Sequence, residues 1–476
     1  MSDRPASSAT AQVEPSTAEG ALYKKRDKIY PREVAGVFAK LRNLTVVVLL
    51  GLYYLLPWVQ MDGRQALLLD LPARKFHIFG LTLWPQDLIY LSALLIIAAL
   101  SLFFFTALAG RLWCGYACPQ TVWTEVFIIM ERWVEGGRQQ QIKLDREPMS
   151  FRKFRIRATK QALWIAFALW TGFTFVGYFS PIRELGESLL TFNLGPWETF
   201  WIFFYSFATW GNAGMLREQV CIYMCPYARF QSAMFDRDTL LIAYDTSRGE
   251  PRGPRKRGTD VRQTGLGDCV DCGLCVQVCP TGIDIRDGLQ YQCIGCAACI
   301  DVCDEVMEKV GYPKGLVRYT TERALEGGKT HILRPRILLY SAGLVLITLA
   351  LVVAIALRTP VELDILRDRN ALYNETSSGW IENVYTLKLI NMVDQPQRFR
   401  ITVAGPPSLT LVTSEGNELL VESGGVRAVP VSLQADPAHL TERSTKIEFT
   451  MESLDDPGIR VTRVGRFLGP APVSGR

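Results

Sequence analysis

Histidine is scarce in this sequence of 476 residues: only His77, His331 and His439 occur, too far apart to form a metal-ligand spacing. We therefore interpret all three as structural or surface residues. Cysteine is absent before Cys114 and after Cys303. No basic run is interleaved with aromatics, which argues against a nucleic-acid partner. No small-residue cleavage site follows the early basic patch, so we expect no secretory signal.

All twelve cysteines belong to spaced motifs. This pattern indicates metal and redox chemistry in a reducing compartment rather than disulfides. Eight of them form two runs of C-x2-C-x2-C-x3-C, the spacing of a bacterial-type ferredoxin that holds two [4Fe-4S] clusters. The fourth cysteine of each run reaches the other cluster in such proteins. We therefore expect one cluster on Cys269, Cys272, Cys275 and Cys303, and the other on Cys293, Cys296, Cys299 and Cys279. A pair of zinc sites is the alternative, although zinc sites close with two separated pairs of ligands.

The other four cysteines form two C-x3-C-P motifs. Cys114 and Cys118 precede Pro119, and Cys221 and Cys225 precede Pro226. Proline is favoured as the first residue of a helix, so Cys118 and Cys225 are predicted to be helix N-caps. A thiolate at that position is stabilised by the backbone amides and the helix dipole. After Pro119, an amphipathic helix is predicted by an apolar face opposite Glu125, Glu131 and Arg132; its members are Val122, Trp123, Val126, Phe127, Met130, Trp133 and Val134.

If packing brings the two motifs together, Cys114, Cys118, Cys221 and Cys225 form a four-sulfur site. Soft sulfur ligands favour Cu(I), zinc or iron-sulfur clusters. The alternative is that these cysteines are small buried residues at helix joints. Met215 and Met224 lie nearby as further thioether ligands or, more ordinarily, as lipid or core contacts.

Apolar residues make up 49% of the chain and are concentrated in a few long runs. Five runs predict transmembrane helices: Leu41 to Val59, Leu88 to Leu108, Gln161 to Ser180, Trp197 to Met215, and Ile337 to Leu357. Lysine and arginine are enriched in the amino-terminal tail, after the second span and after the fourth. By the positive-inside rule, the amino terminus and the clusters are expected in the cytoplasm and everything after Arg358 in the periplasm.

Beyond Arg358 the pattern changes to alternating polar and apolar residues, as in 398–403 and 446–451, with turn signals between the runs. This pattern predicts an antiparallel immunoglobulin-like sandwich. The expected fold class is therefore a multidomain membrane protein: five transmembrane helices, an inserted two-cluster ferredoxin domain and a carboxy-terminal β-sandwich. The expected parts are a disordered basic tail (1–40), a four-span membrane domain (41–240), a ferredoxin-like domain (241–336), the fifth helix (337–357) and the immunoglobulin-like domain (358–476).

These motifs in combination resemble the CcoG family, also called FixG or RdxA. The resemblance is carried by the run from Trp113 to Trp123, the second C-x3-C-P motif, the tandem ferredoxin motif and the run from Gly311 to Tyr319. One departure is Asp304, since proline usually follows the last cysteine. The resemblance implies a protein of the bacterial cytoplasmic membrane that assembles a C-family haem-copper oxidase by reducing Cu(II) to Cu(I), with copper at Cys114, Cys118, Cys221 and Cys225.

The implied partners are oxidase assembly factors or a copper transporter or chaperone, together with an electron donor that the resemblance does not identify. Two other functions fit the same residues. One is quinone-linked electron transfer, as in proteins that resemble the NapH family. The other is a copper-binding assembly scaffold without enzymatic activity.

Overall fold

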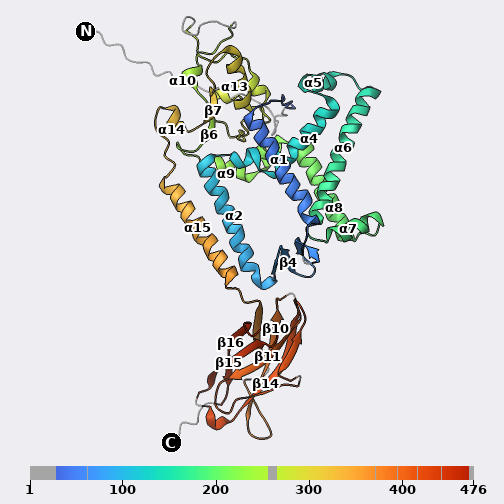
Figure 1. The fold of residues 1–476 in the computed structure, drawn as a ribbon, viewed down its shortest axis with the longest axis vertical. Coiled ribbons are helices and arrows are strands. Elements are labelled where there is room, and N and C mark those ends of the chain that lie inside the picture. The colour runs from blue at the N-terminus through green and yellow to red at the C-terminus, as the bar shows by residue number, and fades with distance from the viewer. Residues whose placement is uncertain are drawn as a thin grey trace, which may run out of the picture. The chain divides into compact units, whose positions relative to one another are not determined.

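The computed structural model describes residues 28–61, 63–255, 265–369, 371–393, 395–414, 416–440 and 442–470. Residues 1–27 of the expected disordered tail lie outside these ranges. The chain divides into two compact units, and several of their elements are labelled in Figure 1. Unit 1 comprises Met1–Val48, Ala109–Phe167 and Thr209–Thr330, and unit 2 comprises Leu49–Leu108, Ala168–Ala208 and His331–Arg476.

Unit 1 contains all the cysteine motifs. Its elements are the first part of α1 (Val37–Leu55), α3 (Leu112–Tyr116), α4 (Pro119–Glu135), α5 (Arg138–Arg146), the first part of α6 (Phe151–Val176), the π-helical segments η3 (Trp210–Leu216) and η4 (Val220–Met224), α9 (Pro226–Met234), β6 (Leu241–Tyr244), α10 (Thr246–Gly249), α12 (Leu274–Gln277), η5 (Ile285–Asp287), α13 (Ala298–Val310), β7 (Val317–Thr320) and α14 (Glu322–Leu325).

Strands β6 and β7 pair antiparallel, with Leu241 opposite Thr320, and they bracket the ferredoxin-like segment. Buried Ile242, Ile285, Met307 and Leu316 form its core together with cysteine side chains. The core therefore surrounds the cysteine loops and fixes their position.

An aspartate of α13 caps the start of α1. The Phe38 amide donates to Asp301 Oδ1 at 3.1 Å and the Ala39 amide donates to Oδ2 at 2.7 Å. Asp301 is 6% exposed, and a Cβ at Gly36 would lie 2.3 Å from its carboxylate. The carboxylate thus satisfies amides that a helix start leaves without a partner. Residues 28–40 of the expected tail are held here as an extended segment followed by the first turn of α1.

Unit 2 contains the remaining helices and the carboxy-terminal strands. Its helices are α2 (Leu88–Ala109), the end of α6, α7 (Ile182–Leu190), α8 (Pro196–Thr209) and α15 (Pro335–Ala356), with 3-10 turns η1 (Leu56–Trp58), η2 (Pro85–Asp87) and η6 (Pro437–His439). Short strands that the sequence patterns did not predict lie between α1 and α2: β1 (Gln60–Met61), β2 (Arg64–Gln65), β3 (Leu67–Asp70), β4 (Lys75–Ile78) and β5 (Leu81–Leu83).

In the described part of the chain, three helices are long and apolar enough to cross a membrane: Val37–Trp58, Leu88–Ala109 and Pro335–Ala356. The prediction of five such helices was wrong. The segments expected as third and fourth spans are helical, but α6 ends at Val176, and only its residues 161–176 follow the cations of its first ten residues. Helix α8 has only 14 residues. At 1.5 Å per residue it measures roughly 21 Å, short of a bilayer core of about 30 Å.

The immunoglobulin-like sandwich is confirmed. In the described ranges its strands are β8 (Val361–Arg367), β9 (Asn374–Glu375), β10 (Ile381–Asn391), β11 (Gln397–Ala404), β12 (Thr410–Val412), β13 (Glu418–Val421), β14 (Val426–Ala435), β15 (Ser444–Ser453) and β16 (Arg460–Leu468). One sheet has the order β12-β14-β10-β8 with β9 beside β10, and the other has the order β13-β11-β15-β16. Inward side chains such as Leu387, Phe399, Val429 and Phe449 are fully buried between them.

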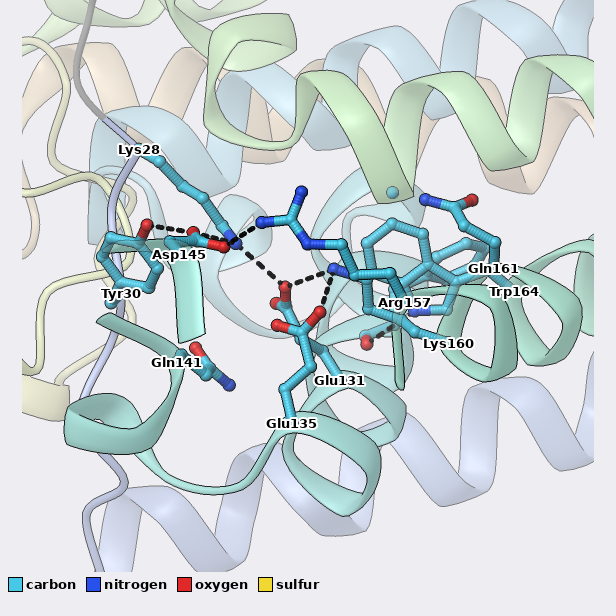
Figure 2. Close-up of polar contacts among 12 residues, drawn as sticks. Lys28, Tyr30, Glu131, Glu135, Gln141, Asp145, Arg157, Lys160, Gln161 and Trp164 are labelled. Atoms are coloured by element: carbon cyan, nitrogen blue, oxygen red, sulfur yellow. Dashed lines mark hydrogen bonds and ion pairs between the residues drawn. The ribbon is translucent and has the colours of Figure 1, made fainter. Parts of the chain in front are cut away.

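Buried charges fix α4, the helix that begins at Pro119 (Figure 2). The Glu131 side chain is 2% exposed and lies 2.6 Å from Arg217 Nη2 and 3.2 Å from the Nζ atoms of both Lys28 and Lys160. One turn later, Glu135 pairs with Lys160 at 2.6 Å. Residues four apart share a helix face, so both carboxylates point into unit 1.

The predicted helix after Pro119 is confirmed, and Val122 and Phe127 of its predicted apolar face are buried, but two other residues depart from the prediction. Glu131, expected on the polar side, is buried, whereas Trp133, expected on the apolar side, is 77% exposed. The reason is that cations from distant segments neutralise Glu131, and periodicity within the helix does not reveal them.

We predict that Glu131→Gln destabilises the protein by about 3–5 kcal/mol, because it leaves buried cations without their counter-charge. Although burial raises the pKa of the Glu131 carboxyl, Arg217, Lys28 and Lys160 together lower it from 4.5 to about 2. The stabilisation is therefore complete above pH 4.5 and is lost as pH falls from there toward 2. The apparent midpoint of thermal unfolding, measured across this range, should fall for the wild type and change less for the variant. Glu125→Gln on the same helix is the control, and an unchanged midpoint at pH 7 for Glu131→Gln would contradict the prediction.

Candidate functional site

The first set of predicted cluster ligands surrounds one cavity. Cys269, Cys272, Cys275 and Cys303 line it, although Cys303 belongs to the second cysteine run. Cys275 lies on α12 and Cys303 on α13. The walls between them are apolar, with Leu274, Val302, Val306 and Leu316.

The second set surrounds a neighbouring cavity. Cys279, Cys293, Cys296 and Cys299 line it, although Cys279 belongs to the first run. Cys275 borders this cavity as well, so the two cavities adjoin. The walls are again apolar, with Ile242, Ile283, Ile285 and Ile294. Four thiols around each apolar cavity fit a [4Fe-4S] cluster, and these eight residues would hold the two clusters.

Both cysteine loops use the same backbone turn. Asp271 and Gly295 have φ values of 53° and 69° just before the second cysteine of their runs. Gly273 and Ala297 have φ values of 62° and 59° two positions later. Left-handed residues at these points reverse the chain so that successive cysteines face the same cavity.

Asp304 stands where a proline usually follows the last cysteine, and the structure gives it a role. Its Oδ1 accepts a hydrogen bond from the Gly315 amide at 2.8 Å. Gly315 precedes β7, which lies beside the first cavity through Leu316 and Val317. The departure from the usual motif therefore ties α13 to the next strand and removes no ligand.

The two C-x3-C-P motifs form the predicted helix starts. Cys118 and Cys225 are extended N-cap residues, with ψ of 129° and 109°, and α4 and α9 begin at the prolines that follow them. Burial nevertheless raises the pKa of the Cys118 thiol, although the amides of Thr121 and Gln120 favour the thiolate. The expected stabilisation of this thiolate is present but is outweighed by burial.

The four thiols of these motifs lie near one another. Burial raises the pKa of Cys114 to about 12, with a further increase from Cys118 and a decrease from Arg111. Burial likewise raises the pKa of Cys221 to about 11, with further increases from Cys118 and Cys225. Cys114 Sγ donates to Gln231 Oε1 at 3.3 Å. Met215 and Met224 are 55% and 59% exposed.

Within the residues that the structure describes, no three His, Cys, Asp or Glu side chains converge so as to hold one metal ion. The four-sulfur site therefore stays a prediction. Its sulfur donors have the chemistry of soft-metal ligands, and a metal would have to displace the thiol protons that burial favours.

The first C-x3-C-P loop packs directly on a cluster loop. A Cβ at Gly115 would lie 2.8 Å from the carbonyl carbon and oxygen of Gly295 and 2.9 Å from Cys296 Cα. Only glycine at position 115 allows this approach of two backbones. The loop that carries Cys114 therefore contacts the loop that carries Cys296.

Two residues without an assigned role in the sequence motifs bridge the same junction. The buried Arg111 guanidinium donates to Cys293 O at 3.3 Å and also bonds Ala228 O. Tyr319 Oη donates to Gly295 O at 2.7 Å and lies 3.4 Å from Tyr116 Oη. Arg111 stands three positions before Cys114, and Tyr319 ends the run from Gly311. Their closeness to these motifs is the only hint of a role that the sequence offers, and it does not reveal which residues they contact.

We predict that the cluster ligands cross between the two runs. Cys279→Ser and Cys293→Ser should abolish the same electron paramagnetic resonance signal, and Cys303→Ser and Cys269→Ser should abolish the other. Each substitution should lower the iron content by about half, because each cluster holds four irons. Anaerobic spectra and iron analysis of the four purified variants provide the measurement. Loss of the same signal in Cys279→Ser and in Cys269→Ser would overturn the crossed arrangement.

Three family models match the chain. A 4Fe-4S dicluster domain matches residues 216–322, a 4Fe-4S binding domain matches residues 91–135, and an IG-like fold at the C-terminal of FixG matches residues 351–470. The crystal structure of a FixG-related protein from Vibrio parahaemolyticus is 30% identical, over 23% of this chain and 97% of that chain, with a TM-score of 0.21.

Relatives match over most of their length. RdxB of Cereibacter sphaeroides is 41% identical over 463 residues, which are 92% of this chain and 96% of that protein. The nitrogen fixation protein FixG of Rhizobium meliloti is 37% identical, over 84% of this chain and 83% of that protein. The cofactors are iron-sulfur clusters of the [4Fe-4S] type, and the chemistry that they supply is electron transfer. With this sequence identity, these cluster domains and this sandwich, the chain belongs to the FixG/RdxA family.

Proposed function

We propose that this iron-sulfur protein reduces Cu(II) to Cu(I) at the thiols of Cys114, Cys118, Cys221 and Cys225, for assembly of a C-family haem-copper oxidase. When bound, the clusters supply electrons one at a time. Each Cu(II) takes up one electron and becomes Cu(I), so one cluster is oxidised for each Cu(I) formed. The observation that carries the proposal is the backbone contact between Gly115 and Gly295.

The contact supports an order of electron flow. The set of Cys279, Cys293, Cys296 and Cys299 adjoins the first C-x3-C-P loop, and the set that includes Cys303 adjoins the second cavity through Cys275. In this proposal electrons pass to copper from the second cavity. Buried Arg111 lies at the junction, where its positive charge favours both an added electron at the cluster and a thiolate at Cys114.

The thiols select the product of the reaction. Thiolate sulfur is a soft ligand and prefers Cu(I), so binding at these cysteines favours the reduced ion. The proposal assigns copper to these four neighbouring thiols, with exchange among them. Copper is thereby a substrate that can leave the site.

Three apolar helices support a place in the membrane. We propose the bacterial cytoplasmic membrane, with the cluster domain in the cytoplasm and the sandwich in the periplasm. The partners in this proposal are oxidase assembly factors or a copper transporter or chaperone that receives Cu(I).

The first test follows copper reduction directly. Protein reduced anaerobically and freed of excess reductant is mixed with Cu(II) and a chelator specific for Cu(I). Wild-type protein should form one Cu(I) per cluster oxidised, because each cluster gives one electron. The variant with Cys114→Ser, Cys118→Ser, Cys221→Ser and Cys225→Ser should keep both cluster signals. It should form Cu(I) no faster than the background rate of the same Cu(II) and chelator mixture in buffer.

Three other outcomes are informative. Equal rates for the variant would show that these thiols are not the copper site. Absence of Cu(I) with wild-type protein would refute copper reduction. Copper delivery to the oxidase by a variant that lacks the cluster ligands would favour the scaffold function instead.

We also predict that Gly115→Ala slows electron transfer to copper by up to about 100-fold, because the added methyl group must push the Cys114 loop from the Gly295 loop. Both cluster signals should persist. Gly343→Ala, where nothing lies within 4 Å of the added Cβ, is the matched control. Stopped-flow absorbance of cluster oxidation by Cu(II) gives the rate, and equal rates for Gly115→Ala and wild type would argue against transfer through this contact.

A further inference from the structure

Unit 1 contains a cavity of about 310 Å³ beside the two kinds of cysteine motif. Its walls come from the segment before α1, the first two turns of α1, one face of α4 and the loop around the second cluster set. Cys296, a predicted cluster ligand, and Cys221, of the second C-x3-C-P motif, both line it. A molecule bound there would therefore lie against both redox motifs.

The walls suit a neutral molecule with a flat apolar body. Val34, Ile128, Ile129 and Ile294 provide apolar surface. Thr124 and Asn43 bring hydrogen-bond donors to the same space. Among the described lining residues, four arginines nearly balance three glutamates, so the cavity has no strong preference for an ion of either sign. Apolar walls with a few polar groups are typical of small-molecule sites of this size.

The position favours a lipid-soluble molecule. Ala39, Arg42 and Asn43 line the cavity from the start of α1, and α1 with η1 is one of the described helices long enough to cross a membrane. A carrier dissolved in the bilayer would meet the cavity where this helix begins. Proximity to the bilayer would not help a soluble ion to reach this cavity.

We propose that this cavity binds a quinol and that the quinol is the electron donor to the clusters. The inference rests on the proposed function, for which it supplies the reductant. Oxidation of one quinol to the quinone releases two electrons and two protons. Clusters held by the two cysteine sets would take up one electron each, and the carboxylates of Glu125 and Glu218, which line the cavity, would accept the protons and pass them to solvent.

The binding test uses 2-heptyl-4-hydroxyquinoline N-oxide, a quinone analogue whose fluorescence is quenched on binding, with the full-length, cluster-loaded protein in detergent. Wild-type protein should quench it saturably, and the analogue should alter the resonance spectrum of the cluster held by Cys296. Thr124→Phe and Ile129→Phe fill the cavity and should weaken binding by about tenfold or more while both cluster signals persist.

Met130→Phe adds an aromatic ring to the same helix outside the cavity and should bind the analogue as wild type does. Quenching that does not saturate with wild-type protein, or equal affinity of a filling variant that retains its clusters, would overturn the proposal. If one filling variant loses its clusters, the affinity of the other variant for the analogue tests the proposal.

A second measurement separates this inference from copper reduction. Menadiol should reduce the clusters of wild-type protein and of Met130→Phe faster than those of the filling variants. Dithionite-reduced filling variants should still reduce Cu(II). Failure with menadiol alone rejects the quinol site and leaves copper reduction intact, whereas failure with Cu(II) alone rejects copper reduction and leaves the quinol site intact.

Discussion

The close contact between the Gly115 and Gly295 backbones constrains everything around the candidate site. Two loops can approach this closely only if no side chain separates them, and each loop needs further packing that fixes its position. On one side, α4 and its buried ion pairs hold the Cys114 to Cys118 loop. On the other, the core around Ile285 and Leu316 holds the cysteine loops of the ferredoxin-like segment. The close approach of the two loops is therefore a product of packing.

The buried charges of unit 1 serve the same need to fix the position of the Cys114 to Cys118 loop. Helix α4 must remain buried although it carries Glu131 and Glu135, and cations from three separate segments neutralise them. Such pairs contribute little net stability, but removing one partner is costly, so they fix one arrangement of the helices. Arg217 also lines the cavity, which joins the ion pairs to the cavity wall.

Local rules predicted much of this molecule from sequence. Cysteine spacing grouped the cysteines that line each of two cavities. The proline rule identified Cys118 and Cys225 as helix N-caps, and alternation identified strands such as β11 and β15. These features depend on residues that are close in sequence. The buried face of α4 does not, because Lys28 and Arg217 lie 103 and 86 positions from Glu131.

The membrane helices illustrate the same limit. A long run of apolar residues indicates that a segment is removed from water, but it does not indicate where the α-helix ends. The run from Trp197 to Met215 is mostly apolar, yet the α-helix ends at Thr209 and a π-helical segment follows. Likewise, Arg111 and Tyr319 each contact a residue more than 180 positions away, Cys293 and Tyr116 respectively.

The cap on α1 restricts how this protein can be taken apart and recombined. Asp301 belongs to the cysteine run but serves a helix that begins more than 250 positions earlier. A soluble ferredoxin spliced into the chain could supply eight cysteines and still leave the Phe38 and Ala39 amides without an acceptor, unless it carried an acidic residue two positions after its seventh cysteine. The ferredoxin-like segment is thus an integral part of the architecture and not an exchangeable module.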